Sequence, residues 1–135
     1  DHVIGPALSR GVNVVCDRFI DSTIAYQGFG RGVPLDTIQM MDQRLCGGLR
    51  PGLTLVIDVD IRTAAARTSG RNRGAGVADT RFEQEGLEFF NRVRGGYVAL
   101  SHQEPGRVLF IDGSGSVSVV QNVVRAAVEE FLHRP

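Results

Sequence analysis

Short apolar runs separated by longer amphipathic stretches set the organisation of this chain. Residues 12–16 and 53–59 are mostly apolar, and residues 107–112 have an apolar centre between Arg107 and Asp112. Such short apolar runs are typical of buried strands. Between these runs, apolar residues recur every three or four positions, and this spacing predicts helices. We expect helices at residues 1–10, 34–46, 61–69 and 82–102, and a last helix that begins at Ser116.

Turn and cap residues sharpen several of these boundaries. Pro34 suits the start of a helix, Gly47 suits its end, and Asp60 suits the N-cap of the next helix. Residues 70–80 are rich in glycine and arginine and predict a mobile loop. Because strands alternate with helices, the pattern predicts an α/β fold with parallel strands and right-handed crossovers. Without repeats or a linker, residues 1–135 are expected to form a single domain.

Composition excludes several classes of partner. The chain has 135 residues, 42% of them hydrophobic, which is enough for one domain with a core. Fifteen basic residues balance fifteen acidic ones, so nothing indicates attraction to nucleic acid or to a membrane surface. Cys16 and Cys46 stand singly and the three histidines are scattered, so the sequence predicts no metal cluster. Two reduced thiols favour a cytoplasmic location.

The richest chemistry follows the first predicted strand, at residues 17–28. In open α/β sheets, ligands bind beyond the carboxyl ends of the strands. An arginine can fork onto phosphate oxygens, hydroxyls and an amide can bind a sugar and a base, and a tyrosine can pack on a ring. This segment therefore predicts a site for a small anionic ligand with a flat ring. The candidate side chains are those of Asp17, Arg18, Ser22, Thr23, Tyr26 and Gln27.

The same segment resembles the thymidylate kinase family, P-loop enzymes that move a phosphate from ATP to dTMP. The family pattern Asp-Arg-aromatic, Ser and Ala-Tyr-Gln-Gly is present at residues 17–28. The resemblance continues, in family order, at residues 30–32, 51–59, 81–97 and 108–112. It implies a P-loop kinase-like, three-layer α/β/α fold with a parallel sheet. It also implies dTMP and ATP as ligands, Mg²⁺ with ATP, and a homodimer for the full-length family member.

The resemblance gives the residues after the first predicted strand separate roles. Arg18 is expected to hold the phosphate of dTMP; the alternative is a salt bridge to Asp17 or Asp21. Asp17 resembles the acid that approaches the magnesium ion or the acceptor oxygen, although it could equally orient Arg18. The serine and threonine match positions near the deoxyribose, or else form a helix N-cap pair.

By resemblance, Tyr26 and Gln27 match positions on the sugar side and the base side of the nucleotide. A buried structural role is the alternative for Tyr26. Phe89, Phe90 and Tyr97, on the helix predicted at 82–102, are expected to be core residues.

Further residues belong to the glycine-rich loop, which resembles the lid that closes over ATP in this family. Arg67, Arg71 and Arg73 precede or enter this loop. At least one of them is expected to clamp the transferred phosphate, with Arg71 or Arg73 favoured over Arg67. The family reads Asp-Arg-aromatic-Glu at the end of the lid, whereas Asp79 here stands one residue early. Glu83 matches a position that faces the metal or the acceptor, or else caps the first turn of its helix.

Every basic residue of this chain is an arginine. A P-loop needs a lysine at the transferred phosphates, so this chain is expected to lack the donor half of the site and to be inactive alone. In the family fold, the P-loop strand lies between the strands matched by residues 12–16 and 53–59. The sheet is therefore expected to be incomplete, and the isolated chain to associate. The alternatives are a related P-loop deoxynucleoside kinase and a non-catalytic nucleotide-binding remnant.

Overall fold

The computed structural model describes residues 3–60 and 80–134, with the side chains of residues 80–85 left aside. Residues 61–79 lie outside this part. They include the helix expected at residues 61–69, Asp79 and all but the last residue of the loop expected at residues 70–80. The elements are α1 (Ile4–Ser9), α2 (Ile20–Thr23), η1 (Ile24–Gly30), α3 (Leu35–Cys46), β1 (Thr54–Asp58), α5 (Thr80–Gln103), β2 (Val108–Asp112) and α6 (Val117–Leu132).

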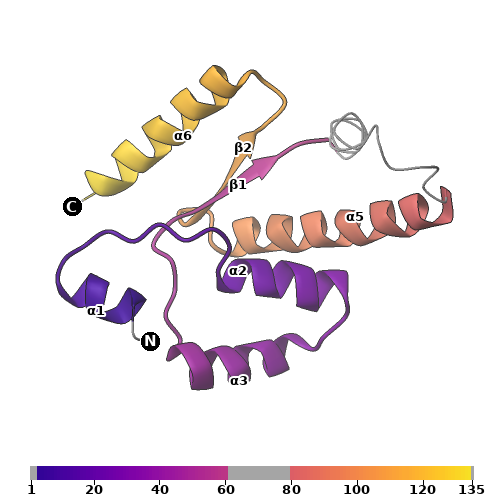
Figure 1. Ribbon diagram of the computed structural model, residues 1–135, viewed down its shortest axis with the longest axis horizontal. Helices are drawn as coiled ribbons and strands as arrows, with labels where there is room; N and C mark the ends of the chain where they lie inside the picture. The colour runs from indigo at the N-terminus through magenta and orange to yellow at the C-terminus, as the bar shows by residue number, and fades with distance from the viewer. Residues whose placement is uncertain (1–2, 61–79, 135) are drawn as a thin grey trace.

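The sheet in the described part consists of β1 and β2. The two strands run parallel, in a register that pairs Thr54 with Val108 and Asp58 with Asp112. Figure 1 shows α6 on one side of this sheet and α5, α2 and α3 on the other. The predicted α/β class with a parallel, incomplete sheet is confirmed.

The strand predicted at residues 12–16 is wrong. This segment has no strand assignment, and its side chains are exposed, Val12 by 50% and Val15 by 99%. A strand needs a neighbour that takes up its backbone hydrogen bonds. Among the described residues, β1 and β2 pair with each other, and residues 12–16 pair with neither strand. Apolar content alone therefore misassigned the segment.

Three of the predicted helix boundaries are confirmed at their caps. Helix α3 follows Pro34 and ends at Gly47, whose φ of 62° is left-handed. The Oγ of Ser116 accepts a hydrogen bond from the amide of Val119 at 3.4 Å and caps α6. No helix in the parts that the structure describes is long and apolar enough to cross a membrane.

The most extensive packing joins α5 to the continuous helix formed by α2 and η1. The η1 segment is a seven-residue π-helix, an element that is often found at functional sites. Arg92 of α5 donates from Nε to the carbonyl of Gly30 at 3.0 Å. The position of Gly30 is tight, because a Cβ there would lie 2.7 Å from the ring of Phe89 and 2.9 Å from Val93. Small residues thus let two helices approach closely beside the candidate site.

Candidate functional site

A cleft of about 420 Å³ lies along α2 and η1 and is closed on one side by α3. Its volume falls in the range that small-molecule sites occupy. The candidate residues Arg18, Ser22, Thr23, Tyr26 and Gln27 all line it, together with Phe19, Ile20, Asp42 and Cys46. The structure therefore brings together most of the side chains that the sequence singled out after residue 17.

Arg18 stands at the entrance to α2 in an unusual backbone conformation. Its φ is 66°, and it is the non-glycine residue with positive φ in the described part of the chain. Such a conformation is costly for a residue with a Cβ, and it often marks a functional position. The guanidinium carbon lies 4.7 Å from the ring centroid of Tyr26, a cation–π contact worth about 0.5–1 kcal/mol. Among the described residues, no carboxylate forms an ion pair with Arg18.

Ser22 and Thr23 are not N-caps. Helix α2 begins after Phe19, which makes no side-chain cap, and both residues lie inside the helix. The Oγ of Ser22 instead shares a hydrogen bond of 2.7 Å with the phenol oxygen of Tyr97 on α5. Tyr97 is thus not a simple core residue. Sequence reasoning missed this contact, although the apolar spacing of the helix places Tyr97 on its packed face.

The aromatic residues around the cleft combine structural and binding roles. Tyr26 is half-buried and meets Phe89 edge to face, with ring centroids 5.9 Å apart. It also lines the cleft, so the two interpretations of Tyr26 hold together. Phe90, expected in the core, is 50% exposed. Gln27 is half-buried on the same helix.

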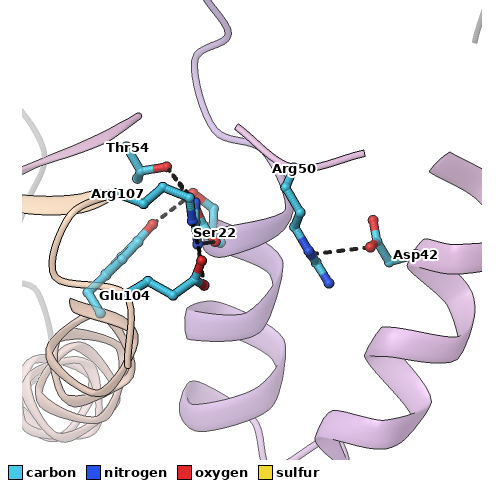
Figure 2. A network of polar contacts seen from close by, with 8 residues as sticks. Ser22, Asp42, Arg50, Thr54, Glu104 and Arg107 are labelled. Carbon is cyan, nitrogen blue, oxygen red and sulfur yellow. Dashed lines mark hydrogen bonds and ion pairs between the residues drawn. The ribbon is translucent and has the colours of Figure 1, made fainter. Parts of the chain in front are cut away.

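A buried polar network anchors the first turn of this helix. Asp21 is 2% exposed, and Arg107 donates to its two carboxylate oxygens at 2.7 and 2.9 Å. Thr54 donates to the same carboxylate at 2.6 Å. Figure 2 shows Arg107 beside Thr54 and Glu104, and the guanidinium also reaches Glu104 at 2.7 Å. Asp21 therefore pairs with Arg107 and not with Arg18.

These contacts shift the ionisation of the network. Burial by itself would raise the pKa of Asp21, but the hydrogen bonds from Arg107 and Thr54 outweigh it and lower that pKa. The hydrogen bond from Arg107 likewise lowers the pKa of Glu104. Asp21, Glu104 and Arg107 therefore all stay charged at neutral pH, and this charged network holds the first turn of α2.

Asp42 is a cleft residue that the sequence did not single out. It is 4% exposed on α3, and its Oδ2 lies 3.2 Å from Nη1 of Arg50. Figure 2 shows Arg50 directed at this carboxylate. Neither carboxylate oxygen has a hydrogen bond of good geometry. Asp42 follows Ile38 by one helical turn, and this spacing was the one available signal that it belongs to the buried face.

The remaining candidates are not brought to the cleft. Asp17 is exposed and does not line it. Arg67, Arg71 and Arg73 lie outside the described residues, and Glu83 belongs to α5 by its backbone alone. Over residues 3–60 and 80–134, no group of three or more acidic, histidine or cysteine side chains could hold a metal ion.

Three comparisons with known proteins agree. The family description "Thymidylate kinase" matches residues 1–124. A thymidylate kinase of Desulfovibrio desulfuricans is 46% identical over 98% of this chain and 62% of its own length. One from Pelobacter propionicus is 43% identical over 94% of this chain and 58% of its own. The crystal structure of thymidylate kinase from Ehrlichia chaffeensis is similar with a TM-score of 0.69 at 29% identity, over 94% of this chain and 56% of that one.

Proposed function

Because the chain belongs to the thymidylate kinase family, we propose that the complete protein transfers the γ-phosphoryl group of ATP to dTMP. An oxygen of the dTMP phosphate attacks the γ-phosphorus, the bond to the bridging oxygen breaks, and dTDP and ADP are formed. The chain spans about 62% of the length of the first relative, so this activity is proposed for the whole protein.

The observation that carries the proposal is the cleft itself. Phosphoryl transfer depends on positioned charge more than on covalent chemistry. Arg18, free of carboxylate partners among the described residues, stands at one end of a helix whose next turns carry Ser22, Thr23 and Gln27. In our proposal Arg18 binds the phosphate of dTMP. The hydroxyls and the amide bind the sugar and base, and Tyr26 packs beside them.

The proposed cofactor is Mg²⁺ bound with ATP. Magnesium is held by one or two carboxylates together with substrate phosphates, so it requires no protein cluster. The exposed carboxylate of Asp17, next to Arg18 in the sequence, suits that limited role. When bound, the ion would neutralise charge on the phosphates, and Asp17 would orient it or the acceptor oxygen.

The proposal also includes a donor half of the site. We propose that Arg67, Arg71 or Arg73 clamps the transferred phosphate and that Glu83 faces the metal or the acceptor. Because the chain contains no lysine, it has no P-loop lysine of its own. We therefore infer that these 135 residues alone do not phosphorylate dTMP.

The remaining proposals concern setting and assembly. The two cysteines are free thiols, which supports a reducing, cytoplasmic setting. Met40, Met41 and Leu45 of α3 are exposed by 51%, 56% and 70%, and such apolar surface supports a homodimer of the complete protein. The balanced charge supports the absence of a nucleic-acid or membrane partner.

The decisive experiment measures ADP formation by the complete protein with dTMP and with thymidine, and titrates dTMP by calorimetry. We expect turnover with dTMP, and Arg18→Ala should weaken dTMP binding at least about 10-fold by removing charge-assisted hydrogen bonds. Arg125→Ala, on the exposed side of α6, is the matched control and should bind as the wild type does.

Three other outcomes of this experiment would contradict the proposal. Turnover of thymidine without turnover of dTMP would identify a deoxynucleoside kinase. Binding of dTMP without any turnover by the complete protein would identify a non-catalytic nucleotide-binding protein. Unchanged binding by Arg18→Ala would contradict the acceptor site itself.

A further inference from the structure

One residue of the cleft is held by a side chain outside it. Ser22 lines the cleft, and its Oγ lies 2.7 Å from the phenol oxygen of Tyr97, 75 positions away in the sequence. Tyr97 is half-buried on α5 and is not itself a lining residue. The hydrogen bond therefore connects the cleft to the helix packed behind it.

The position of the phenol is fixed by close helix packing. Gly96, the neighbour of Tyr97, faces the α2–η1 helix so closely that a Cβ would lie 2.9 Å from the ring of Phe29 and 3.0 Å from the Cα of Ala25. A longer side chain at this position would push α5 away. Because residue 96 is a glycine, the backbones of the two helices can approach each other closely. The phenol of Tyr97 then lies within hydrogen-bonding distance of Ser22.

The polarity of this hydrogen bond follows from the chemistry of its two groups. A phenol is a much stronger acid than an aliphatic alcohol and is therefore the better donor. Burial raises the pKa of Tyr97, so the phenol keeps its proton throughout the neutral range. The geometry by itself allows either oxygen to be the donor, and the greater acidity of the phenol favours donation by Tyr97 to Ser22. The proton of Ser22 can then point elsewhere, and Ser22 lines the cleft.

We propose that Tyr97 is a positioning residue that makes Ser22 a hydrogen-bond donor into the cleft, toward an acceptor oxygen of the bound nucleoside monophosphate. Without the phenol, the hydroxyl of Ser22 can rotate and is no longer pre-oriented, which adds an ordering cost to binding. This inference rests on the proposed function, because it takes a nucleoside monophosphate as the ligand of the cleft.

A double-mutant cycle in the complete protein tests the proposal, with the Kd for dTMP as its readout. We expect Ser22→Ala to weaken binding about 10-fold and Tyr97→Phe about 3-fold, in line with the loss and the disordering of one hydrogen bond. The double variant should bind as Ser22→Ala alone does, because Tyr97 acts only through Ser22. Ser101→Ala, which removes another hydroxyl from α5 outside the cleft, should leave the Kd unchanged.

A merely structural role for Tyr97 gives a different result. Tyr97→Phe would then weaken binding by the same factor in the wild type and in Ser22→Ala, and this additivity would overturn the proposal, as would an unchanged Kd. Melting temperatures of all variants verify that the ring still packs. If the protein phosphorylates another nucleoside monophosphate in place of dTMP, the proposed function is wrong, and the same cycle with that nucleotide decides the role of Tyr97. Binding of no nucleotide contradicts both.

Discussion

Gly95 and Gly96 are neighbours on α5 with opposite surroundings. A Cβ at Gly96 would meet Phe29 and Ala25 at 2.9 and 3.0 Å, whereas a Cβ at Gly95 would meet nothing within 4 Å. Gly96→Ala should therefore lower the free energy of unfolding by about 1–3 kcal/mol through overpacking. Gly95→Ala should raise it by about 0.5–1 kcal/mol, because alanine favours the helix.

Urea unfolding of the complete protein measures both changes. The two variants make the same chemical change one residue apart, so each serves as the control for the other. Equal effects of the same sign would show that α5 does not approach the cleft helix, which is the continuous α2–η1 helix, as described.

At the scale of single residues, the sequence predicted the residues in the first turns of the cleft better than the residues that other helices bring to it. Arg18, Ser22, Tyr26 and Gln27 were predicted because they are close in sequence and follow one apolar run. Tyr97 and Asp42 were missed as site residues, because their roles depend on how α5 and α3 cross the cleft helix. Spacing along one helix carries no information about such crossings.

The charged network around Asp21 connects helix α2 to strand β1, through Thr54, and to the turn before β2, through Arg107. Because Arg107 and Thr54 lower the pKa of Asp21, the stabilisation is complete above the unfolded-state pKa of about 4 and is lost as pH falls through the folded-state value. Above pH 5, Asp21→Asn should lower the free energy of unfolding by about 1–3 kcal/mol.

The difference between wild type and Asp21→Asn should shrink below pH 4, since both then lack the charge. Urea midpoints from pH 7 to pH 2 measure it in the complete protein. Glu129→Gln, on the exposed side of α6, is the control and should run parallel to the wild type. A constant difference down to pH 2 would mean that the ionised carboxylate does not stabilise the fold.

At the scale of elements, the predictions held where local signals decided the structure. Pro34, Gly47 and Ser116 fixed the ends of α3 and α6, and β1 and β2 pair in parallel as alternation with helices predicts. Residues 12–16 have strand composition without a strand partner. A helix closes its hydrogen bonds within itself, whereas a strand depends on a neighbour that its own sequence does not contain.

At the scale of the whole molecule, the described part exposes apolar side chains on residues 12–16 and on strand β1. Val12, Val15 and Ile57 are exposed by 50%, 99% and 47%, and β1 pairs on one edge only among the described residues. Open edges and apolar patches favour association. The isolated 135-residue chain should therefore form oligomers or aggregates and show no cooperative melt.

Sedimentation velocity and calorimetry of the isolated chain test this expectation. Val15→Lys should reduce the association, because a charge on exposed apolar surface opposes its burial against another molecule. A monomeric chain with a sharp, reversible melt would show that residues 12–16 need no further partner.

The contacts that complete the cleft have a consequence for its synthesis on the ribosome. Ser22 and Asp21 are translated early, but their partners Tyr97 and Arg107 follow 75 and 86 residues later. At about 5–20 residues per second, the second interval lasts roughly 4–17 s. During that time a nascent chain carries the carboxylate of Asp21 without its guanidinium partner. Translation must pass Arg107 before the first turn of the cleft helix can settle.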